Sequence, residues 1–353
     1  MNLTKSELIT AMQKCLPGVE KGSSLIEGAD AFLFGNNQIH TYNDSIAVSV
    51  PVNLDGMSGA VKAMDFFKLV SKINAAIIMV EPTDDGKLHL IAGRTKASIM
   101  LLKTQTEAYI QELNVTGLKW IKIPDNFLEG LKLCKMSCNP TPLRGICVVG
   151  NHMYSTDSVR INMFTLSSEM ESFWLDDPTV GDLMKMGPIT DYCIVGNWAH
   201  LRMGDGTVFS CRRKDHSQFP VSQILTQISM VEAIDPGLKV SNHLPQALVE
   251  VVDRVATMAS GDGAASQLVK LTFKKDEVNI FATKSSGSAE ESAPLETPFE
   301  VEPCLILWVE SNFLTEAAKK VMDFDVVRAG GSCPALVFHS LNYIQLASTN
   351  DGI

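Results

Sequence analysis

The 353-residue sequence has little of several features that mark common protein classes. It contains no apolar run near the roughly 18 residues needed to cross a bilayer. Its first residues, MNLTKSELIT, show no basic leader followed by an apolar stretch. We therefore expect a soluble, cytoplasmic protein with no membrane partner. Positive charge is also scarce, with 30 Lys and Arg against 40 Asp and Glu, and the net charge of −10 taken alone argues against a nucleic-acid partner.

Motifs for catalysis are missing as well. The segment GMSGA lacks the spacing of a G-x-S-x-G nucleophile elbow, and no phosphate-cradling G-x-x-x-x-G-K-[ST] occurs. The seven histidines follow neither H-x-x-x-H nor H-E-x-x-H spacing. Asp44 and Asp157 could suggest paired carboxylates, but each is expected in the same turn of a repeated hairpin, where Asp accepts backbone N–H bonds. We expect no catalytic residues, no enzymatic activity and no cofactor.

The eight cysteines are scattered through apolar segments and form no dense framework. They predict reduced, structural thiols. Cys134 and Cys138 lie one helical turn apart and could share a metal ion. A tetrahedral site needs two further ligands at usable spacing, and none is nearby. The sequence therefore predicts no metal site.

What the sequence does contain is internal repetition. Residues 40–50, HTYNDSIAVSV, are similar to residues 154–163, YSTDSVRINM, and a second pair of segments, LHLIAGRTKASIM and AHLRMGDGTVFSC, places His89 and His200 111 positions apart. A repeat this long exceeds the roughly 20 to 50 residues of solenoid units, so it indicates whole domains in tandem. We expect three domains with the same order of helix, strands, helix and strands. Their predicted bounds are 1–117, 118–235 and 236–353.

Individual segments support this order. Residues 4–15 carry apolar residues at helical spacing, and 59–73 return to that period. After residues 59–73 and before the second domain, we expect three strands, in the segments AAIIMVEP, KLHLIAG and KASIMLLK. Residues 285–296, SSGSAEESAPLE, are polar and predict a mobile loop within the third domain.

Charge is unevenly distributed along the chain. The five stronger helix candidates, 5–15, 60–73, 126–138, 245–260 and 311–322, together carry +4, which leaves −14 for the remainder of a chain with net charge −10. If the helices of each domain share one side, that side is mildly basic, although any single lysine is more often a solvated helix position. The basic residues expected there are Lys14, Lys62, Lys68, Lys72, Lys132, Lys135, Arg254, Lys319 and Lys320. Such a surface would contact phosphates weakly and without reading bases.

These features together resemble the bacterial-type DNA sliding clamp, the beta subunit of the replicative DNA polymerase, in a divergent form such as phages also encode. The segments YSTDSVRINM, GTVFSCRRKDHSQFP and LILWVESNFLTEAAKKV carry the resemblance, which extends through the threefold helix-strand order over the whole chain. It implies an α+β fold of three tandem DNA-clamp domains, each with two helices packed on two antiparallel four-stranded sheets. It also implies a crescent-shaped subunit that forms a ring around double-stranded DNA.

The resemblance further implies a site for partners such as DNA polymerase and the clamp loader. In the family, a short hydrophobic peptide docks between domains two and three, at a segment that usually reads Thr-Asp-Gly-His-Arg-Leu. Here the segment reads Thr-Asp-Ser-Val-Arg-Ile, so the implied pocket residues are Thr156, Val159, Arg160 and Ile161. The changes from Gly to Ser and from His to Val alter the expected peptide preference. A core strand position is an equally good interpretation of Ile161.

A homodimer is implied in the same way, because the family pairs an edge strand of domain one with domain three of the other subunit. The matching segment is KASIMLLK, with Ile99 and Leu101, or their alternates Met100 and Leu102, at the seam and Met258 opposite. Exposed apolar edge strands invite pairing. The alternative hypothesis is a clamp-fold adaptor or enzyme that has lost DNA encirclement and stays monomeric.

Overall fold

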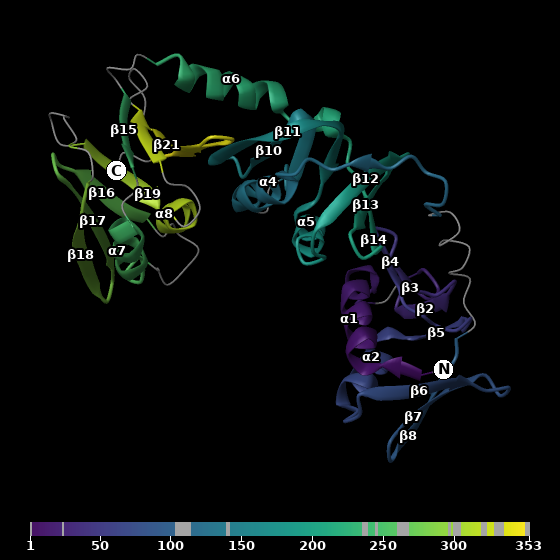
Figure 1. Cartoon of the computed structure of the whole chain (residues 1–353). Coiled ribbons are helices and arrows are strands. Elements are labelled where there is room, and N and C mark those ends of the chain that lie inside the picture. The colour runs from purple at the N-terminus through teal and green to yellow at the C-terminus, as the bar shows by residue number, and fades with distance from the viewer. Residues whose placement is uncertain are drawn as a thin grey trace. The chain divides into compact units, whose positions relative to one another are not determined.

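The computed structural model describes residues 2–22, 25–102, 114–138, 142–234, 239–243, 246–259, 268–295, 298, 305–318, 323–327 and 335–349. The chain divides into two compact units, Met1–Leu128 with Pro178–Lys214 and Glu129–Asp177 with Asp215–Ile353. Both units combine helices with antiparallel sheets, which confirms the expected α+β class (Figure 1). None of the described helices is both long and apolar enough to cross a membrane.

The first unit contains a four-stranded sheet with strand order β1-β6-β7-β8. Its strands are β1 (Asn2–Thr4), β6 (Ile77–Pro82), β7 (Lys87–Ala92) and β8 (Thr95–Met100). The three strands predicted from AAIIMVEP, KLHLIAG and KASIMLLK are thereby confirmed. β8 lies at the edge of the sheet, with β7 on its inner side.

The same unit contains an eight-stranded sheet with strand order β5-β2-β3-β4-β14-β13-β12-β9. Its strands are β2 (Ala31–Gly35), β3 (Gln38–Tyr42), β4 (Ile46–Pro51), β5 (Gly59–Lys62), β9 (Ile121–Lys122), β12 (Ile189–Val195), β13 (Trp198–Met203) and β14 (Val208–Arg212). Four strands come from the first predicted repeat and four from the second. The two sets join where β4 pairs with β14.

Helices α1 (Lys5–Cys15) and α2 (Ala63–Lys72) pack against each other in the first unit. The helical spacing of α1 is confirmed by its buried residues, which are Leu8, Ala11, Met12 and Cys15. The chain then tightens into the 3-10 turn η1 (Leu16–Gly18). Lys5 Nζ donates to the carbonyl oxygens of Ser71 and Ile73, at 3.1 and 2.5 Å. These carbonyls lie at the negative end of the α2 dipole, where a cation is stabilising.

The second unit contains a six-stranded sheet with strand order β10-β11-β22-β21-β20-β15. Its strands are β10 (Ile146–Thr156), β11 (Arg160–Leu175), β15 (Lys239–His243), β20 (Asp323–Val327), β21 (Ala335–Ser340) and β22 (Tyr343–Ser348). β10 and β11 form a long hairpin whose register shifts near Gly150. This sheet again joins strands of two predicted repeats, because β11 of the second pairs with β22 of the third.

A second sheet of this unit has strand order β18-β17-β16-β19. Its strands are β16 (Leu268–Phe273), β17 (Glu277–Lys284), β18 (Gly287–Pro294) and β19 (Leu305–Glu310). The loop predicted over 285–296 is therefore wrong for most of its length. β18 is an edge strand, and edge strands carry charged and polar residues that protect them from unwanted pairing. Composition alone made this strand resemble a loop.

The remaining helices are α4 (Phe127–Cys134), α5 (Asp177–Leu183), α6 (Val221–Glu232), α7 (Gln246–Ala256) and α8 (Ser311–Ala318), with the 3-10 turns η2 (Lys135–Ser137) and η3 (His216–Gln218). Among the described residues, the first and third predicted repeats have two helices each, as expected, and α7 packs against α8. The second predicted repeat has three, because α6 is a helix that was not expected from the sequence. The first and third repeats also show two sets of four strands each, whereas the described part of the second repeat has one set of four and the long β10-β11 hairpin.

Candidate functional site

The turns of the two repeated hairpins have the same hydrogen bonding. Asn43 Oδ1 accepts the backbone N–H groups two and three residues ahead, at 3.2 and 2.8 Å, and Asp157 Oδ1 accepts the corresponding pair at 3.1 and 2.6 Å. The residues that follow, Asp44 and Ser158, both have left-handed backbone with φ of 67° and 73°. Asn43 is therefore the counterpart of Asp157, and the expected equivalence of Asp44 with Asp157 is wrong by one residue. Asn and Asp both form this turn, which hid the offset.

Each hairpin gives its second strand to the sheet of the following repeat. In the first unit, β4 pairs with β14 and Ile46 lies opposite Cys211. In the second unit, β11 pairs with β22 and Arg160 lies opposite Ala347. Ile46 and Arg160 occupy the same position after their turns. The hairpin recurs because it forms the junction between successive repeats.

The turns themselves reinforce these junctions. Ser45 O accepts the backbone N–H of Arg212 at 2.8 Å, and Val159 O accepts that of Ser348 at 3.1 Å. Ser45 and Val159 are equivalent positions of the two turns. Each junction is therefore fixed at its end by a main-chain bond from the last residue of the joining strand.

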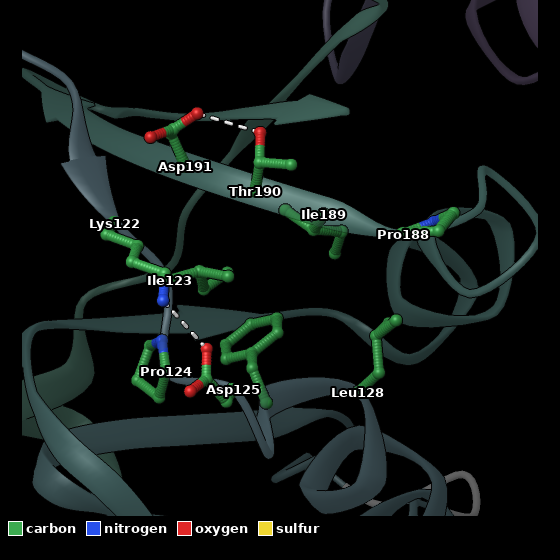
Figure 2. Close-up of a pocket in the computed structure, with 10 residues that line it drawn as sticks. Lys122, Ile123, Pro124, Asp125, Leu128, Pro188, Ile189, Thr190 and Asp191 are labelled. Carbon is green, nitrogen blue, oxygen red and sulfur yellow. Dashed lines mark hydrogen bonds and ion pairs between the residues drawn. The ribbon is translucent and has the colours of Figure 1, made fainter. Parts of the chain in front are cut away.

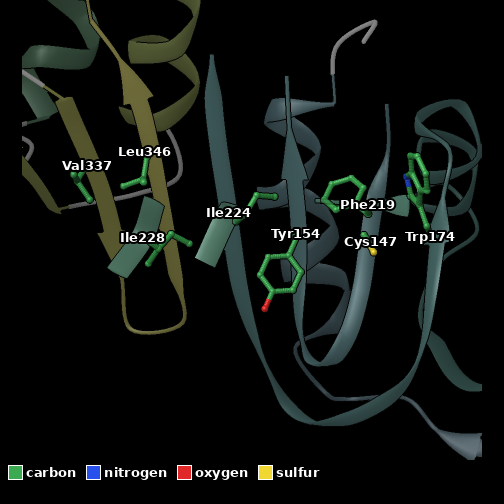
Figure 3. Packing of buried hydrophobic residues seen from close by; sticks show 8 residues of the cluster. All are labelled: Cys147, Tyr154, Trp174, Phe219, Ile224, Ile228, Val337 and Leu346. Atoms are coloured by element: carbon green, nitrogen blue, oxygen red, sulfur yellow. The ribbon is translucent and has the colours of Figure 1, made fainter. Parts of the chain in front are cut away.

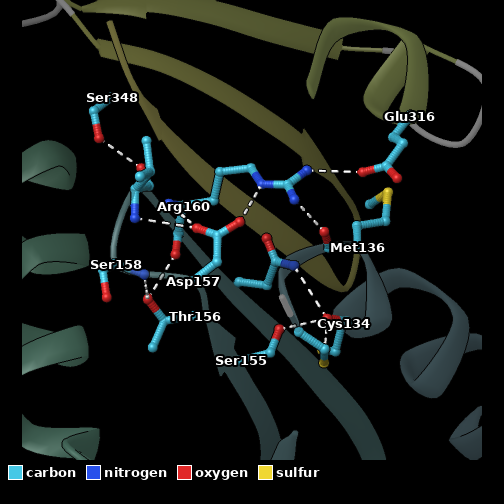
Figure 4. A network of polar contacts seen from close by, with 12 residues as sticks. Cys134, Met136, Ser155, Thr156, Asp157, Ser158, Arg160, Glu316 and Ser348 are labelled. Carbon is cyan, nitrogen blue, oxygen red and sulfur yellow. Dashed lines mark hydrogen bonds and ion pairs between the residues drawn. The ribbon is translucent and has the colours of Figure 1, made fainter. Parts of the chain in front are cut away.

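Arg160 has a buried set of partners in the second unit (Figure 4). Its Nε donates to Asp157 Oδ2 at 2.8 Å, its Nη1 donates to Glu316 Oε2 at 2.8 Å, and its Nη2 donates to the carbonyl of Met136. The guanidinium also stacks on the ring of Phe313 at 3.9 Å from the ring centroid. Only 2% of the Arg160 side chain is exposed. Arg160 therefore holds the hairpin against α8, and it does not face solvent.

The other predicted pocket residues differ in exposure. Thr156 is buried, and its hydroxyl donates to Arg160 O at 2.7 Å while accepting from the Ser158 N–H at 3.1 Å. Val159 is 43% exposed at the tip of the turn. Ile161 is half-buried, and it packs against the large apolar cluster of this unit. The structure thus places Thr156 and Arg160 in support of the turn and leaves Val159 and Ile161 closer to solvent.

The apolar cluster lies on the face of the six-stranded sheet that carries Ile161 (Figure 3). Its buried members are Cys147, Tyr154, Trp174, Phe219, Ile224, Ile228, Val337 and Leu346. Met163 and Ile344 pack at its margin. Ile224 and Ile228 come from α6, so this helix covers the sheet next to the predicted pocket. Their spacing of four residues after Pro220 is the sequence signal that could have revealed α6.

A pocket of about 320 Å³ opens beside this cluster. Met163, Val231 and Ile344 supply apolar walls, and Glu232 and Asp325 add carboxylates. Asp325 Oδ1 lies 3.1 Å from His339 Nε2 at the same pocket. The pocket therefore combines apolar walls with two carboxylates, one of which lies beside His339.

Several of the predicted basic residues already have acidic partners within the chain. The pairs are Lys14 with Asp205, Lys62 with Asp30, Lys135 with Asp177, and Arg254 with Glu291. These pairs lower the positive charge that the helices present. Lys68 and Lys72 on α2 are exposed, and within the described part of the chain neither forms an ion pair. Lys132 on α4 is also exposed.

Lys319 and Lys320 lie outside the described residues, so their expected place on the last helix remains a prediction. The predicted seam residues lie on or beside the edge strands of two sheets, β8 and β18. Ile99 lies on β8 and Leu101 directly after it, both half-buried, and Met100 between them is 58% exposed. Met258 is half-buried, and its methyl group lies against the first residue of β18.

A second pocket, of about 480 Å³, lies in the first unit between β12 and the segment before α4 (Figure 2). Its apolar walls include Phe127, Leu128 and Ile189. Lys122 forms an ion pair with Asp125 at 3.0 Å across its rim. The sequence analysis assigned no role to this pocket.

The described cysteines are buried free thiols, as predicted. Burial raises the pKa of the Cys138 and Cys211 thiols to about 12, so both thiols are protonated at neutral pH. Cys138 Sγ instead donates to the carbonyl of Cys134 at 3.5 Å. Among the described residues, no group of three or more His, Cys, Asp or Glu side chains could hold a metal ion.

No protein-family model and no curated protein sequence matches the chain. Solved structures do. A DNA polymerase sliding clamp from Bacillus subtilis is similar with a TM-score of 0.81 and 14% identity, covering 100% of this chain and 99% of that one. A Helicobacter pylori beta clamp bound to a DNA ligase peptide gives 0.76 and 14%, with 99% of each chain covered. A Bartonella birtlesii sliding clamp bound to griselimycin gives 0.78 and 16%, covering 99% and 98%. The chain therefore has the sliding-clamp fold over its whole length.

Proposed function

We propose that the protein is a DNA polymerase sliding clamp, a processivity factor that closes as a homodimer around double-stranded DNA. It tethers DNA polymerase and other partners, and it is opened by a clamp loader. It consists of three clamp domains, 1–117, 118–235 and 236–353, and it acts in the cytoplasm. It has no catalytic activity of its own.

One observation carries this proposal. Two junctions between repeats use equivalent pairs of strands, and the equivalent strands of a third junction lie at open edges of the described sheets. β4 joins β14, and β11 joins β22. By the order of the repeats, β18 is the counterpart of β4 and β11, and β8 is the counterpart of β14 and β22. β18 and β8 each lie at the open edge of a four-stranded sheet. Pairing β18 of one subunit with β8 of another would repeat the internal junction, and a repeated head-to-tail contact closes a ring when its rotation allows.

The charges of the two free edges support this pairing. Arg94 and Lys96, beside and within β8, are exposed. β18 carries Glu290, and also Glu291, whose carboxylate pairs with Arg254 of the same chain. Opposite charges across paired strands are stabilising, and like charges destabilise. The edges would therefore attract each other and repel a second copy of themselves, which favours a head-to-tail dimer.

Contact with DNA would come from the exposed lysines of the helices. Lys68 and Lys72 are the strongest candidates, because they form no ion pair within the described part of the chain, whereas Lys14, Lys62, Lys135 and Arg254 already pair with carboxylates. Lys132 is a further candidate because it is exposed on α4. A few exposed lysines give weak, sequence-independent phosphate contact. Such contact suits a ring that has to move along a duplex. Partner peptides would dock on the apolar sheet face next to Val159 and Ile161.

Retention on circular DNA tests the proposal directly. The purified protein is loaded on nicked circular plasmid with a bacterial clamp loader, and protein and DNA are separated by gel filtration in high salt. A topological link keeps the protein with the circle and releases it when a restriction enzyme linearises the plasmid. Equal loss from circular and linear DNA, with a monomer by native mass spectrometry, would support a clamp-fold adaptor instead.

A further inference from the structure

Helix α6 covers the apolar face of the six-stranded sheet through a narrow contact. Of its twelve residues, Ile224 and Ile228 are the buried ones, and they lie one helical turn apart. They insert among side chains of the sheet that include Val337 and Leu346 (Figure 3). The opposite side of the helix is open to solvent, where Leu225 is 40% exposed and Met230 59%. α6 is therefore held mainly by one aliphatic stripe.

The start of α6 is anchored much more firmly than its body. Phe219 is buried, and its ring meets that of Trp174 edge-on with centroids 5.3 Å apart. Pro220 follows as the N-cap residue with non-helical backbone. The helix thus leaves a fixed aromatic anchor through a proline. Beyond that point its fully buried contacts come from two isoleucines, and Val221, Val231 and Ile234 pack partly buried against the same cluster. This geometry allows α6 to leave the sheet without disturbing the anchor.

The surface beneath α6 extends beyond the helix. Ile161, Met163 and Ile344 are half-buried at the margin of the cluster. Met163 and Ile344 continue into the pocket of about 320 Å³, which Val231 of α6 also lines. The apolar strip that α6 occupies is therefore continuous with an open apolar pocket. Removal of the helix would lengthen this pocket into a groove.

We propose that α6 is a displaceable lid on the partner-binding groove, and that a partner enters by replacing Ile224 and Ile228 with two aliphatic side chains of its own. The partner is a short apolar segment with branched or aliphatic residues about one helical turn apart. The identity of the partner as a replication protein rests on the proposed function, but the lid does not.

The lid is tested with the helix itself as the probe. A fluorescein-labelled peptide of residues 221–234, VSQILTQISMVEAI, is titrated against the wild-type chain and against the double variant Ile224→Ser and Ile228→Ser. Because the variant's own helix no longer competes, we expect the peptide to bind it at least tenfold more tightly, as measured by fluorescence anisotropy. The matched control is Gln223→Ser with Gln227→Ser, which alters the exposed side of the same helix and should bind the peptide as the wild type does.

Hydrogen exchange of the full chain gives an independent measurement. In the wild type, α6 amides beyond the first turn should exchange at least a hundredfold faster than those of β11 and β22, because a lid opens without global unfolding. In the double variant they should exchange faster still, while β11 and β22 remain protected and show that the unit is folded. Equal protection of α6 and β22 in the wild type would overturn the lid. So would peptide binding of equal strength to both proteins, or to neither.

These outcomes are separable from those of the DNA experiment. A chain that is lost equally from circular and linear DNA but whose double variant captures the helix peptide has a lid without clamp function. A chain that is retained on circular DNA but whose α6 exchanges as slowly as the sheet is a clamp without a lid.

Discussion

Arg160 and Asp157 form a buried ion pair inside a four-residue turn, with Nε and Oδ2 2.8 Å apart. The same carboxylate accepts the backbone N–H of Arg160 at 2.6 Å. One residue thus closes the turn and orients the guanidinium toward Glu316 on α8. The hairpin that forms the junction with the next repeat is in this way locked to a helix of that repeat.

Replacing Arg160 with alanine should destabilise the second unit by about 3 to 5 kcal/mol, because it leaves the Asp157 carboxylate buried without its partner. Urea unfolding followed by tryptophan fluorescence measures the change. Arg212→Ala is the control, since Arg212 pairs with Asp44 at 2.6 Å at a partly exposed turn, where an ion pair contributes about 1 kcal/mol or less. Equal losses for the two variants would contradict a special role for the buried pair.

The role of Arg160 shows where sequence reasoning stops. The resemblance implies a peptide pocket that includes Arg160, and this stays a prediction. The structure shows the Arg160 side chain buried and stacked on the ring of Phe313. Its partner Glu316 lies 156 residues further along the chain, and no local pattern connects the two. Helical periodicity, in contrast, is a local signal. The buried face of α1 depends only on residues within the helix, so Leu8, Ala11, Met12 and Cys15 were predictable from their spacing.

Two further segments differ from what the sequence predicts. The composition of β18, rich in Ser and Glu, predicts a loop, yet an edge strand with a hydrogen-bonded partner on one side tolerates those residues. α6 was not predicted, although Ile224 and Ile228 lie one helical turn apart after Pro220. The order of the repeats, in contrast, could be predicted from the sequence. Hairpins that form equivalent junctions keep similar residues, even though Asp157 corresponds to Asn43 and not to Asp44.

Reversing the charge of the free edge of β8 should prevent dimer formation. Arg94→Glu with Lys96→Glu would bring like charge to Glu290 across the proposed seam, and like charges opposite each other in paired strands are destabilising. We expect native mass spectrometry to show a monomer. Adding Glu290→Lys should restore the dimer, which a merely unfolded variant could not do. The control Lys21→Glu with Lys119→Glu alters exposed lysines away from β8 and should leave the dimer intact.

Reversing Lys68, Lys72 and Lys132 together to Glu should weaken loading on DNA without unfolding the protein. Each lost phosphate contact lowers the slope of log K against log salt by about 0.9. The slope is measured by equilibrium binding of the protein to duplex DNA between low and moderate salt. The triple variant Lys21→Glu, Lys119→Glu and Lys275→Glu carries the same change of charge at exposed positions outside the helices. If the slope falls by the same amount in both triple variants, net charge governs DNA binding, and the helix lysines do not form the phosphate contacts.

His40 and His200 predict that stability falls in mild acid. Each donates or accepts a hydrogen bond of 2.8 Å between Nδ1 and a serine hydroxyl on the neighbouring strand, Ser49 and Ser210 respectively. Burial lowers the pKa of both imidazoles, with a hydrogen bond of His40 to the backbone of Gly35 raising that of His40 in part. Below the ordinary histidine pKa of about 6.5 the unfolded chain therefore binds protons that the folded chain does not.

Stability should consequently decrease as the pH falls below about 6.5, by up to about 1.4 kcal/mol per pH unit for each histidine, until the lowered folded-state pKa is reached. Urea unfolding between pH 7.5 and 5 measures this slope. The double variant His40→Gln and His200→Gln should be less stable at pH 7.5 but should lose less stability on acidification than the wild type. His216→Gln, on the 3-10 turn η3, should keep the wild-type slope. If the double variant keeps the wild-type slope, other groups govern the loss of stability in acid. His40 and His200 would then have the ordinary histidine pKa.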